Sequence, residues 1–145
     1  MTVRIIKKEE LSKLLPLYKH LHDNDTDVEI GVLDKVWETI QDNDAHTYFV
    51  IEQNNLFVSS CNLTVIPNLT RGGKSISLIE NVVTHRDYRN RGLGRLVIEA
   101  ALGHARSKNC YKVMLFSGSH RVDSHKFYNA LGFNSDDKVG FSMKL

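Results

Sequence analysis

The sequence has 145 residues, of which 41% are hydrophobic and 25% charged, and its formal net charge is +2. These values are close to those of average globular domains, so they exclude disordered and fibrous chains and predict a single domain over residues 1–145. The small net charge does not favour a nucleic-acid partner, and no apolar run is long enough to span a membrane. The N-terminus lacks the apolar core of a signal peptide, so we expect a cytoplasmic protein without a membrane partner.

The first forty residues predict a strand followed by two helices. Residues 3–6 form a short β-like run, and apolar residues then recur at helical spacing over residues 11–21 and 33–40. An acidic, turn-rich segment over residues 23–27 separates the two helices.

Three strands are predicted next, over residues 47–51, 56–66 and 75–83. Asn54 and Asn55 lie between the first two, and asparagine tolerates the positive φ that a tight hairpin turn needs. Gly72 and Gly73 lie between the second and the third. Consecutive strands with short connections predict an antiparallel meander.

The last third of the chain predicts a helix, a buried strand, a short helix and a final strand. The first helix begins near Leu93, and the buried strand spans residues 111–116. A connection through one helix suits a right-handed crossover, so strands 75–83 and 111–116 are predicted to be parallel neighbours. The short helix covers residues 124–131, and alternating apolar residues over 139–145 predict the last strand. The predicted fold class is α/β, with a mixed sheet.

Residues 89–95, RNRGLGR, lie where the third meander strand passes into a helix. A helix N-terminus carries partial positive charge, so Arg89, Arg91 and Arg95 are unfavourable there unless an anion binds. Gly92 and Gly94 leave backbone N–H groups accessible at the same end. The pattern favours a pyrophosphate ligand, and a solvated surface loop is the alternative.

Two common nucleotide-binding motifs do not fit this segment. A Walker A loop continues with Lys and Ser or Thr after its last glycine, whereas Arg95 and Leu96 follow Gly94 here. The dinucleotide-binding fingerprint needs a third glycine, but Val97 stands at that position. Another carrier of pyrophosphate is therefore indicated.

Residues 89–94 and 126–133 resemble the two signatures of the GNAT superfamily of N-acetyltransferases. The first is Arg/Gln-x-x-Gly-x-Gly/Ala, and the second is an aromatic-rich helix before a Gly-Phe pair, here KFYNALGF. The predicted order of elements is similar to that fold over the whole chain. The resemblance implies an antiparallel meander plus a central parallel pair that splays to admit acetyl-CoA, flanked by about four helices.

Acetyl-CoA is the co-substrate that the resemblance implies, and no metal is expected. The strand before the loop would pair with the pantetheine amides, and backbone amides of the loop would hold the phosphates. Asp123 stands where many members carry an asparagine contact to the cofactor, and Arg121 or Ser124 is the expected substitute. The expected cofactor-binding residues are Val82, Val83, Arg89, Arg91, Gly92, Leu93, Gly94, Arg95 and Ser124.

Tyr128 and Glu80 are the predicted catalytic residues. A tyrosine hydroxyl normally stays protonated at neutral pH, so Tyr128 can act as the acid that protonates the departing thiolate. Glu80 can take a proton from the attacking amine, directly or through water. Alternatives are a packing role for Tyr128, a surface ion pair for Glu80, and His120 or His125 as the base.

The sequence therefore predicts an N-acetyltransferase that moves an acetyl group to a primary amine by direct attack in a ternary complex. Neither Cys61 nor Cys110 lies near the two motifs, and both are expected to be reduced thiols rather than a disulfide.

The acceptor stays open between a small amine, an amino sugar and a peptide amine. Residues 79–83 also resemble glucosamine-phosphate N-acetyltransferases, which usually carry aspartate where Asn81 stands. The alternative function is a non-catalytic coenzyme A-binding or regulatory module, and the resemblance is compatible with a homodimer.

Overall fold

The computed structural model describes residues 1–22 and 24–145. Asp23, the first residue of the predicted acidic turn, lies outside the described residues. The chain groups into two compact units, residues 1–115 and residues 116–145, and each is described by itself.

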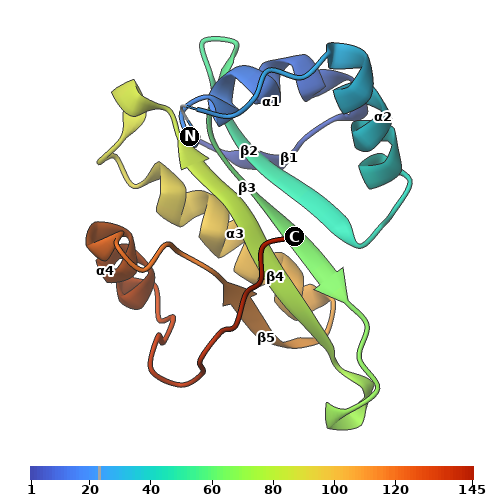
Figure 1. Ribbon diagram of the computed structural model, residues 1–145, viewed down its shortest axis with the longest axis vertical. Coiled ribbons are helices and arrows are strands. Elements are labelled where there is room, and N and C mark those ends of the chain that lie inside the picture. The colour runs from blue at the N-terminus through green and yellow to red at the C-terminus, as the bar shows by residue number, and fades with distance from the viewer. Residues whose placement is uncertain (23) are drawn as a thin grey trace. The chain divides into compact units, whose positions relative to one another are not determined.

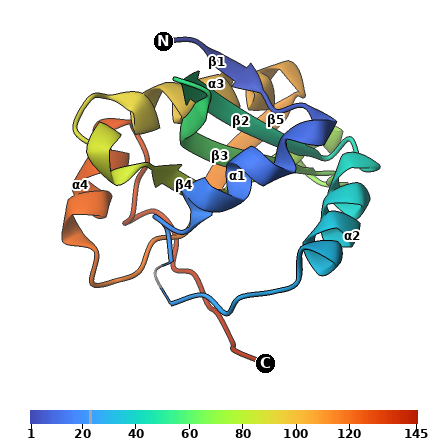
Figure 2. The same ribbon diagram turned by 90° about the horizontal axis from the view of Figure 1, so that it is seen from above.

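The first unit is a five-stranded sheet with helices on both faces (Figures 1 and 2). The strand order is β1-β2-β3-β4-β5, with antiparallel pairs up to β4 and a parallel β4–β5 pair. Helices α1 and α2 cover one face, and α3 covers the other. The elements are β1 (Val3–Ile5), α1 (Leu11–Tyr18), α2 (Ile30–Gln41), β2 (His46–Gln53), β3 (Leu56–Ile66), β4 (Ser75–Thr84), α3 (Leu93–Ser107) and β5 (Cys110–Leu115), with short 3₁₀ turns at Lys8–Glu10, Arg71–Gly73 and Arg86–Tyr88. The predicted mixed sheet, meander and parallel pair are confirmed.

The central strands are buried on both faces, which explains why their sequences are almost continuously apolar. Tyr48 and Val50 of β2 belong to a core cluster with Trp37 and the buried leucines of α1. Phe49, between them, points the other way, and its ring lies 5.7 Å from that of His104 on α3. Each helix layer therefore has its own core against one face of the sheet.

The hairpin between β2 and β3 follows the prediction from its asparagine pair. Asn54 and Asn55 both have positive φ, 52° and 63°. Two consecutive left-handed residues match the turn type whose twist suits a two-residue hairpin.

Strands β4 and β5 run together for only half the length of β4. Their paired residues extend from Ser75 to Ile79 in β4 and from Cys110 to Leu115 in β5. Of the residues after Ile79, Glu80, Val83 and Thr84 pair with β3 alone among the described strands. Strand β5 ends at Leu115, opposite Ile79, so the last part of β4 has no β5 partner among the described strands, and the splay that the resemblance implies stays a prediction.

The second unit contains one helix, α4 (Val122–Ala130), and an irregular C-terminal segment. The aromatic rings of Phe127, Tyr128 and Phe133 contact one another in sequence, with centroid separations of 5.1 and 6.1 Å. The predicted final strand over residues 139–145 is wrong, because this segment has no strand assignment. Its alternation of apolar residues is real, but alternation supplies no ladder of hydrogen bonds, and a strand needs that ladder to form.

Both cysteines are free, as expected. Cys61 is fully buried beneath α3, where its thiol donates to the Val97 carbonyl at 3.3 Å. Burial raises the pKa of this thiol to about 12, so it stays protonated and poorly nucleophilic at neutral pH. No helix in the described parts of the chain combines the length and apolar character needed to cross a membrane.

Candidate functional site

The start of α3 offers unpaired backbone donors to a ligand. Gly92 caps the helix with φ 77°, a left-handed conformation that glycine adopts without strain. The Leu96 amide bonds to the Gly92 carbonyl, so the amides of the preceding residues of the first turn have no acceptor within the helix. No acidic residue occupies that turn. The helix end therefore fits an anion.

The three arginines of the segment occupy different environments. Arg95 forms an ion pair with Glu99 one turn later, with its Nε 2.7 Å from the carboxylate. The Arg91 guanidinium lies over the Tyr88 ring, 5.1 Å from the centroid, and forms no ion pair with a carboxylate among the described residues. Arg89 donates to two backbone carbonyls. Arg91 is thus the only one of the three whose guanidinium has neither an ion pair nor a hydrogen bond in the described part of the fold.

The part of β4 beyond its last pair with β5 carries Val82 and Val83, the residues expected to pair with pantetheine. The Val83 side chain is buried in the core on the α1 side of the sheet. The Val83 carbonyl accepts a hydrogen bond from the Ser59 hydroxyl at 3.1 Å. Val82 and Val83 both follow the last residue of β4 that pairs with β5, so this stretch has a free edge among the described strands.

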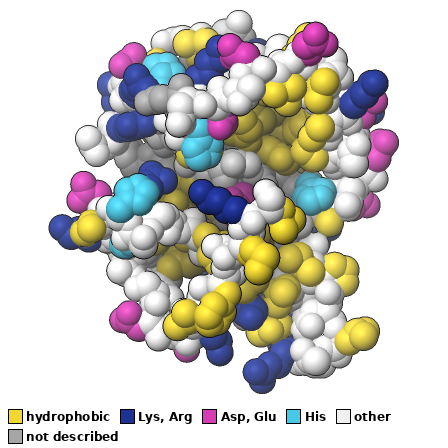
Figure 3. Space-filling view, viewed as in Figure 1, with side chains coloured by type: hydrophobic (Ala, Val, Ile, Leu, Met, Phe, Trp, Pro, Cys, Tyr) yellow, Lys and Arg dark blue, Asp and Glu magenta, His cyan; other side chains and the backbone are white. Residues whose placement is uncertain are grey.

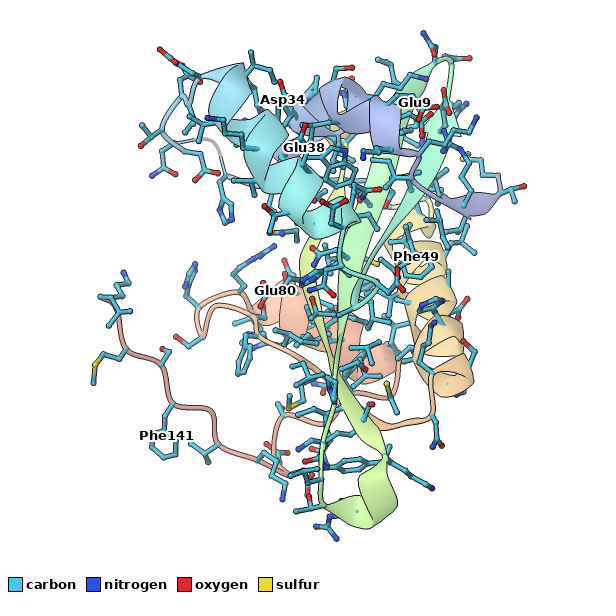
Figure 4. The ribbon with its side chains drawn as sticks, turned by 90° about the vertical axis from the view of Figure 1, so that its right-hand side faces the viewer. Glu9, Asp34, Glu38, Phe49, Glu80 and Phe141 are labelled. Carbon is cyan, nitrogen blue, oxygen red and sulfur yellow. The ribbon has the colours of Figure 1, made fainter. Side chains whose placement is uncertain are left out.

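Glu80 is an exposed residue of β4, and two polar side chains accompany it. It lies opposite Asn62 of β3, and Asn62 lies opposite Tyr48 of β2. Asn81 has a positive φ of 51°, and the β3–β4 register shifts beside it. Figure 4 shows Glu80 and Phe49 on opposite sides of the strands, so Glu80 belongs to the face that carries α1 and α2.

The remaining predicted residues lie in the second unit. Ser124, Asp123 and His120 line an open hollow of about 320 Å³ at the start of α4. His125 is held by a hydrogen bond between its Nε2 and the Gly118 carbonyl, 2.8 Å away. A carbonyl only accepts, so Nε2 carries the proton and is not available as a base in this arrangement. Tyr128 lies on α4 one turn after Ser124, and its ring contacts the rings of Phe127 and Phe133.

Three residues important to this geometry were not found from the sequence. Asn62 stands in an apolar run, and a polar residue inside a predicted buried strand was the available signal. Thr84 and His20 contribute backbone carbonyls to Arg89, and a carbonyl contact leaves no trace in residue type. In residues 1–22 and 24–145 no group of three or more His, Cys, Asp or Glu side chains is arranged to hold a metal ion.

Comparison with known proteins gives a consistent result. The family model described as the acetyltransferase (GNAT) family matches residues 11–133. The chain is 31% identical over 150 residues to glucosamine 6-phosphate N-acetyltransferase of Trypanosoma brucei brucei, covering 95% of this chain and 92% of that protein.

Solved structures share the fold. A putative acetyltransferase from Agrobacterium tumefaciens str. C58 superposes with a TM-score of 0.94 at 35% identity, with 100% of both chains covered. An aminoglycoside N-acetyltransferase in complex with CoA superposes with a TM-score of 0.76 at 20% identity, covering 99% of each chain.

The fold and these relatives define the class of protein as an acyltransferase enzyme, more narrowly an N-acetyltransferase. The chain belongs to the acetyltransferase (GNAT) family. Enzymes of this family use acetyl-CoA as the acetyl donor.

Proposed function

We propose that this enzyme transfers the acetyl group of acetyl-CoA to a primary amine by direct attack in a ternary complex. The observation that carries the proposal is the combination of two features on β4 and α3. The strand loses its β5 partner after Ile79, and the helix that follows begins with unpaired amides beside Arg91, whose guanidinium has neither an ion pair nor a hydrogen bond in the described part of the fold. A pantetheine chain needs the first feature, and a pyrophosphate needs the second.

The residues present fit acetyl-CoA. Val82 and Val83 would offer backbone groups at the free edge of β4, and the amides of Arg91 to Arg95 would receive the phosphates. Ser124 would supply a hydroxyl contact in place of the asparagine that many family members carry. When bound, acetyl-CoA supplies an activated thioester whose acetyl group an amine can accept.

Glu80 and Tyr128 divide the proton transfers in this proposal. An alkyl amine of ordinary pKa is mostly protonated at neutral pH and must lose a proton before it can attack. Glu80 takes that proton, directly or through water, because it is exposed on β4 directly after the last residue that pairs with β5. Tyr128 gives its hydroxyl proton to the sulfur that leaves. His120 lines the hollow at the start of α4 and is the alternative base.

An amino sugar is the first acceptor to test. The relative with 31% identity is a glucosamine 6-phosphate N-acetyltransferase, and the alignment covers nearly the whole chain. The polar groups beside Glu80 belong to Asn62 and Asn81, whose amides can both donate and accept hydrogen bonds. Such groups suit the hydroxyls of a sugar. Figure 3 shows hydrophobic side chains gathered beside α2, and several apolar residues of α2 are exposed. Such a surface could contact a peptide, so peptide amines are also acceptors to test.

Measurement of coenzyme A release with a panel of acceptors tests the proposal. The panel contains glucosamine 6-phosphate, glucosamine, aminoglycosides, polyamines, amino acids and peptides, and mass spectrometry identifies the acetylated product. We expect one class to be acetylated, and Tyr128→Phe to lower kcat by roughly 10²-fold or more while acetyl-CoA affinity is kept. Acetyl-CoA binding without release for any acceptor would instead support a non-catalytic coenzyme A-binding module.

Three expectations stay predictions. Sedimentation velocity would test the homodimer, and fractionation of cells would test the cytoplasmic location. The absence of a nucleic-acid partner would be tested by titration with DNA and RNA at low salt, where electrostatic binding is strongest.

A further inference from the structure

Arg89 differs from the other arginines of its segment because its donors bond to backbone carbonyls of two other segments of the chain. Its Nε donates to the Thr84 carbonyl at 3.2 Å, and its Nη2 donates to the His20 carbonyl at 3.1 Å. Thr84 ends β4, and His20 follows the end of α1. One side chain therefore joins the strand that precedes the loop to the segment that follows the first helix.

The guanidinium group suits this task. Its N–H donors lie in one plane in a fixed fork, so two carbonyls determine both the place and the orientation of the group. Charge-assisted hydrogen bonds are also stronger than neutral ones. The two bonds leave the Arg89 backbone, and the loop attached to it, in a defined position relative to α1 and β4.

The loop over residues 85–92 needs such support because its own backbone bonds are few and its conformation is unusual. The amides of Tyr88 and Arg89 bond to carbonyls three residues earlier, within a single 3₁₀ turn. Asn90 and Gly92 then both have positive φ, 60° and 77°. These two left-handed residues turn the chain into α3, but no regular series of backbone hydrogen bonds holds the loop in that conformation.

Two other contacts join His20 to the loop over residues 85–92, but they are weaker. The Arg86 amide lies 3.5 Å from His20 Nδ1, which is the outer limit of a hydrogen bond. The His20 and His85 rings contact each other with centroids 4.0 Å apart and a tilt of 41°. These contacts help to bring the two segments together, and the Arg89 bonds are the better directed ones.

We propose that Arg89 is a positioning residue that fixes the phosphate-binding loop, and that it aids coenzyme binding through its two hydrogen bonds rather than through its charge. The charge offered to the ligand then belongs mainly to Arg91, because its contact with the Tyr88 ring orders the side chain without neutralising it. This inference rests on the proposed function, since it takes the loop to be the coenzyme site.

Titration calorimetry of coenzyme A with the full chain over a series of salt concentrations tests this division of roles. Arg89→Lys keeps the charge but loses the planar fork, whereas Arg89→Gln loses the charge and keeps an N–H donor near the position of Nε. We expect both variants to weaken binding by roughly tenfold or more, with Arg89→Gln no weaker than Arg89→Lys. Arg91→Gln should weaken binding and flatten the salt dependence more than Arg89→Gln does.

Arg106→Gln is the matched control, because Arg106 is exposed on the last turn of α3 and should bind as the wild type does. Wild-type affinity in Arg89→Lys, or a salt dependence flattened equally by Arg89→Gln and Arg91→Gln, would overturn the positioning role. Thermal melts show which variants fold. If Arg89→Gln does not fold, the coenzyme A affinities and salt dependences of Arg89→Lys and Arg91→Gln decide whether Arg89 is a positioning residue.

Amide hydrogen exchange of the coenzyme-free protein separates this inference from the proposed function. We expect faster exchange over residues 19–22 and 85–92 in both Arg89 variants, and wild-type exchange there in Arg91→Gln. Unchanged exchange in the Arg89 variants overturns the positioning role. Failure of the wild-type protein to bind coenzyme A overturns the proposed function, and the exchange result still decides what Arg89 does.

Discussion

The side-chain nitrogen of Asn81 donates a hydrogen bond to the side-chain oxygen of Asn62, 3.1 Å away on the neighbouring strand. The bond crosses from β4 to β3 where the register between these strands shifts. Asn62 is buried, whereas Asn81 is partly exposed and has positive φ. Asparagine is one of the few residues that tolerate this conformation, so the pair supports an irregularity directly beside Glu80.

Substitutions at Asn81 should reveal this backbone strain. Both Asn81→Gly and Asn81→Ala remove the bond to Asn62, but only glycine adopts positive φ freely. We expect Asn81→Ala to be less stable than Asn81→Gly by about 1–2 kcal/mol in the free energy of unfolding, measured by urea denaturation. Equal stability of the two variants would show that the left-handed conformation is not maintained in solution.

Glu80→Gln tests the proposed base without changing the size of the side chain. We expect kcat to fall by roughly 10²-fold or more at neutral pH, with acetyl-CoA affinity unchanged, because the amide cannot accept the proton of the amine. Glu9→Gln is the matched control, since Glu9 is an exposed carboxylate in the 3₁₀ turn before α1 (Figure 4). Full activity of Glu80→Gln would move the role to His120 or to water.

The stability of the first unit should depend on pH through a cluster of charges around Arg4. The guanidinium bonds to both oxygens of Glu10, at 2.7 and 2.8 Å, and also to Glu52, which pairs with Lys13. The bond to Arg4 is the main reason that the pKa of Glu10 falls from 4.5 to about 2. The unfolded chain therefore binds more protons than the folded one in this window, so stability falls as pH drops from about 4.5 toward 2.

Chemical denaturation at a series of acidic pH values checks this expectation. Glu10→Gln should be less stable than the wild type at neutral pH, and its stability should change less between pH 5 and pH 2. A variant that retains the full wild-type slope would assign the acid sensitivity to other carboxylates.

The contacts between His20 and the loop over residues 85–92 should also weaken at acidic pH. Burial, followed by the neighbouring His85, Arg86 and Arg89, lowers the pKa of His20 below its ordinary value of 6.5, and Asp87 opposes this shift. The folded protein thus binds fewer protons at this site than the unfolded chain. The stabilisation is complete above pH 6.5 and is lost as pH falls through the lower folded pKa.

We therefore expect the amides of residues 85–92 to exchange faster with solvent, after correction for intrinsic rates, as the pH is lowered below 6.5. His20→Asn keeps the backbone carbonyl that Arg89 contacts, so it should remove the pH dependence while preserving that bond. A pH response that persists in His20→Asn would assign it to His85 or to another group.

The predictable parts of this protein are those whose cause is local in the sequence. The Asn54-Asn55 turn follows from tolerance of positive φ, and the order of strands follows from apolar runs and connection lengths. Gly92 was predicted to lie at the helix start with accessible backbone N–H groups, and it caps α3 in the left-handed conformation that glycine adopts readily.

The part that failed and the contacts that were not foreseen both depend on distant partners. Alternation over residues 139–145 was complete, yet a strand also needs a neighbouring edge, which no local pattern supplies. Arg89 is predicted to contact phosphate because its charge is visible in the sequence, and that contact stays a prediction. Its bonds to the carbonyls of Thr84 and His20 arise only when α1 and β4 are brought together by the fold.

In the proposed function, the loop before α3 holds the phosphates of acetyl-CoA. Titration calorimetry with acetyl-CoA and with S-acetylpantetheine, which lacks all the phosphates, tests it directly in the wild type and in Arg91→Ala. We expect Arg91→Ala to weaken the binding of acetyl-CoA by about tenfold or more and to leave the binding of S-acetylpantetheine unchanged. Equal losses for both ligands, or none for either, would contradict the assignment of the loop to the phosphates.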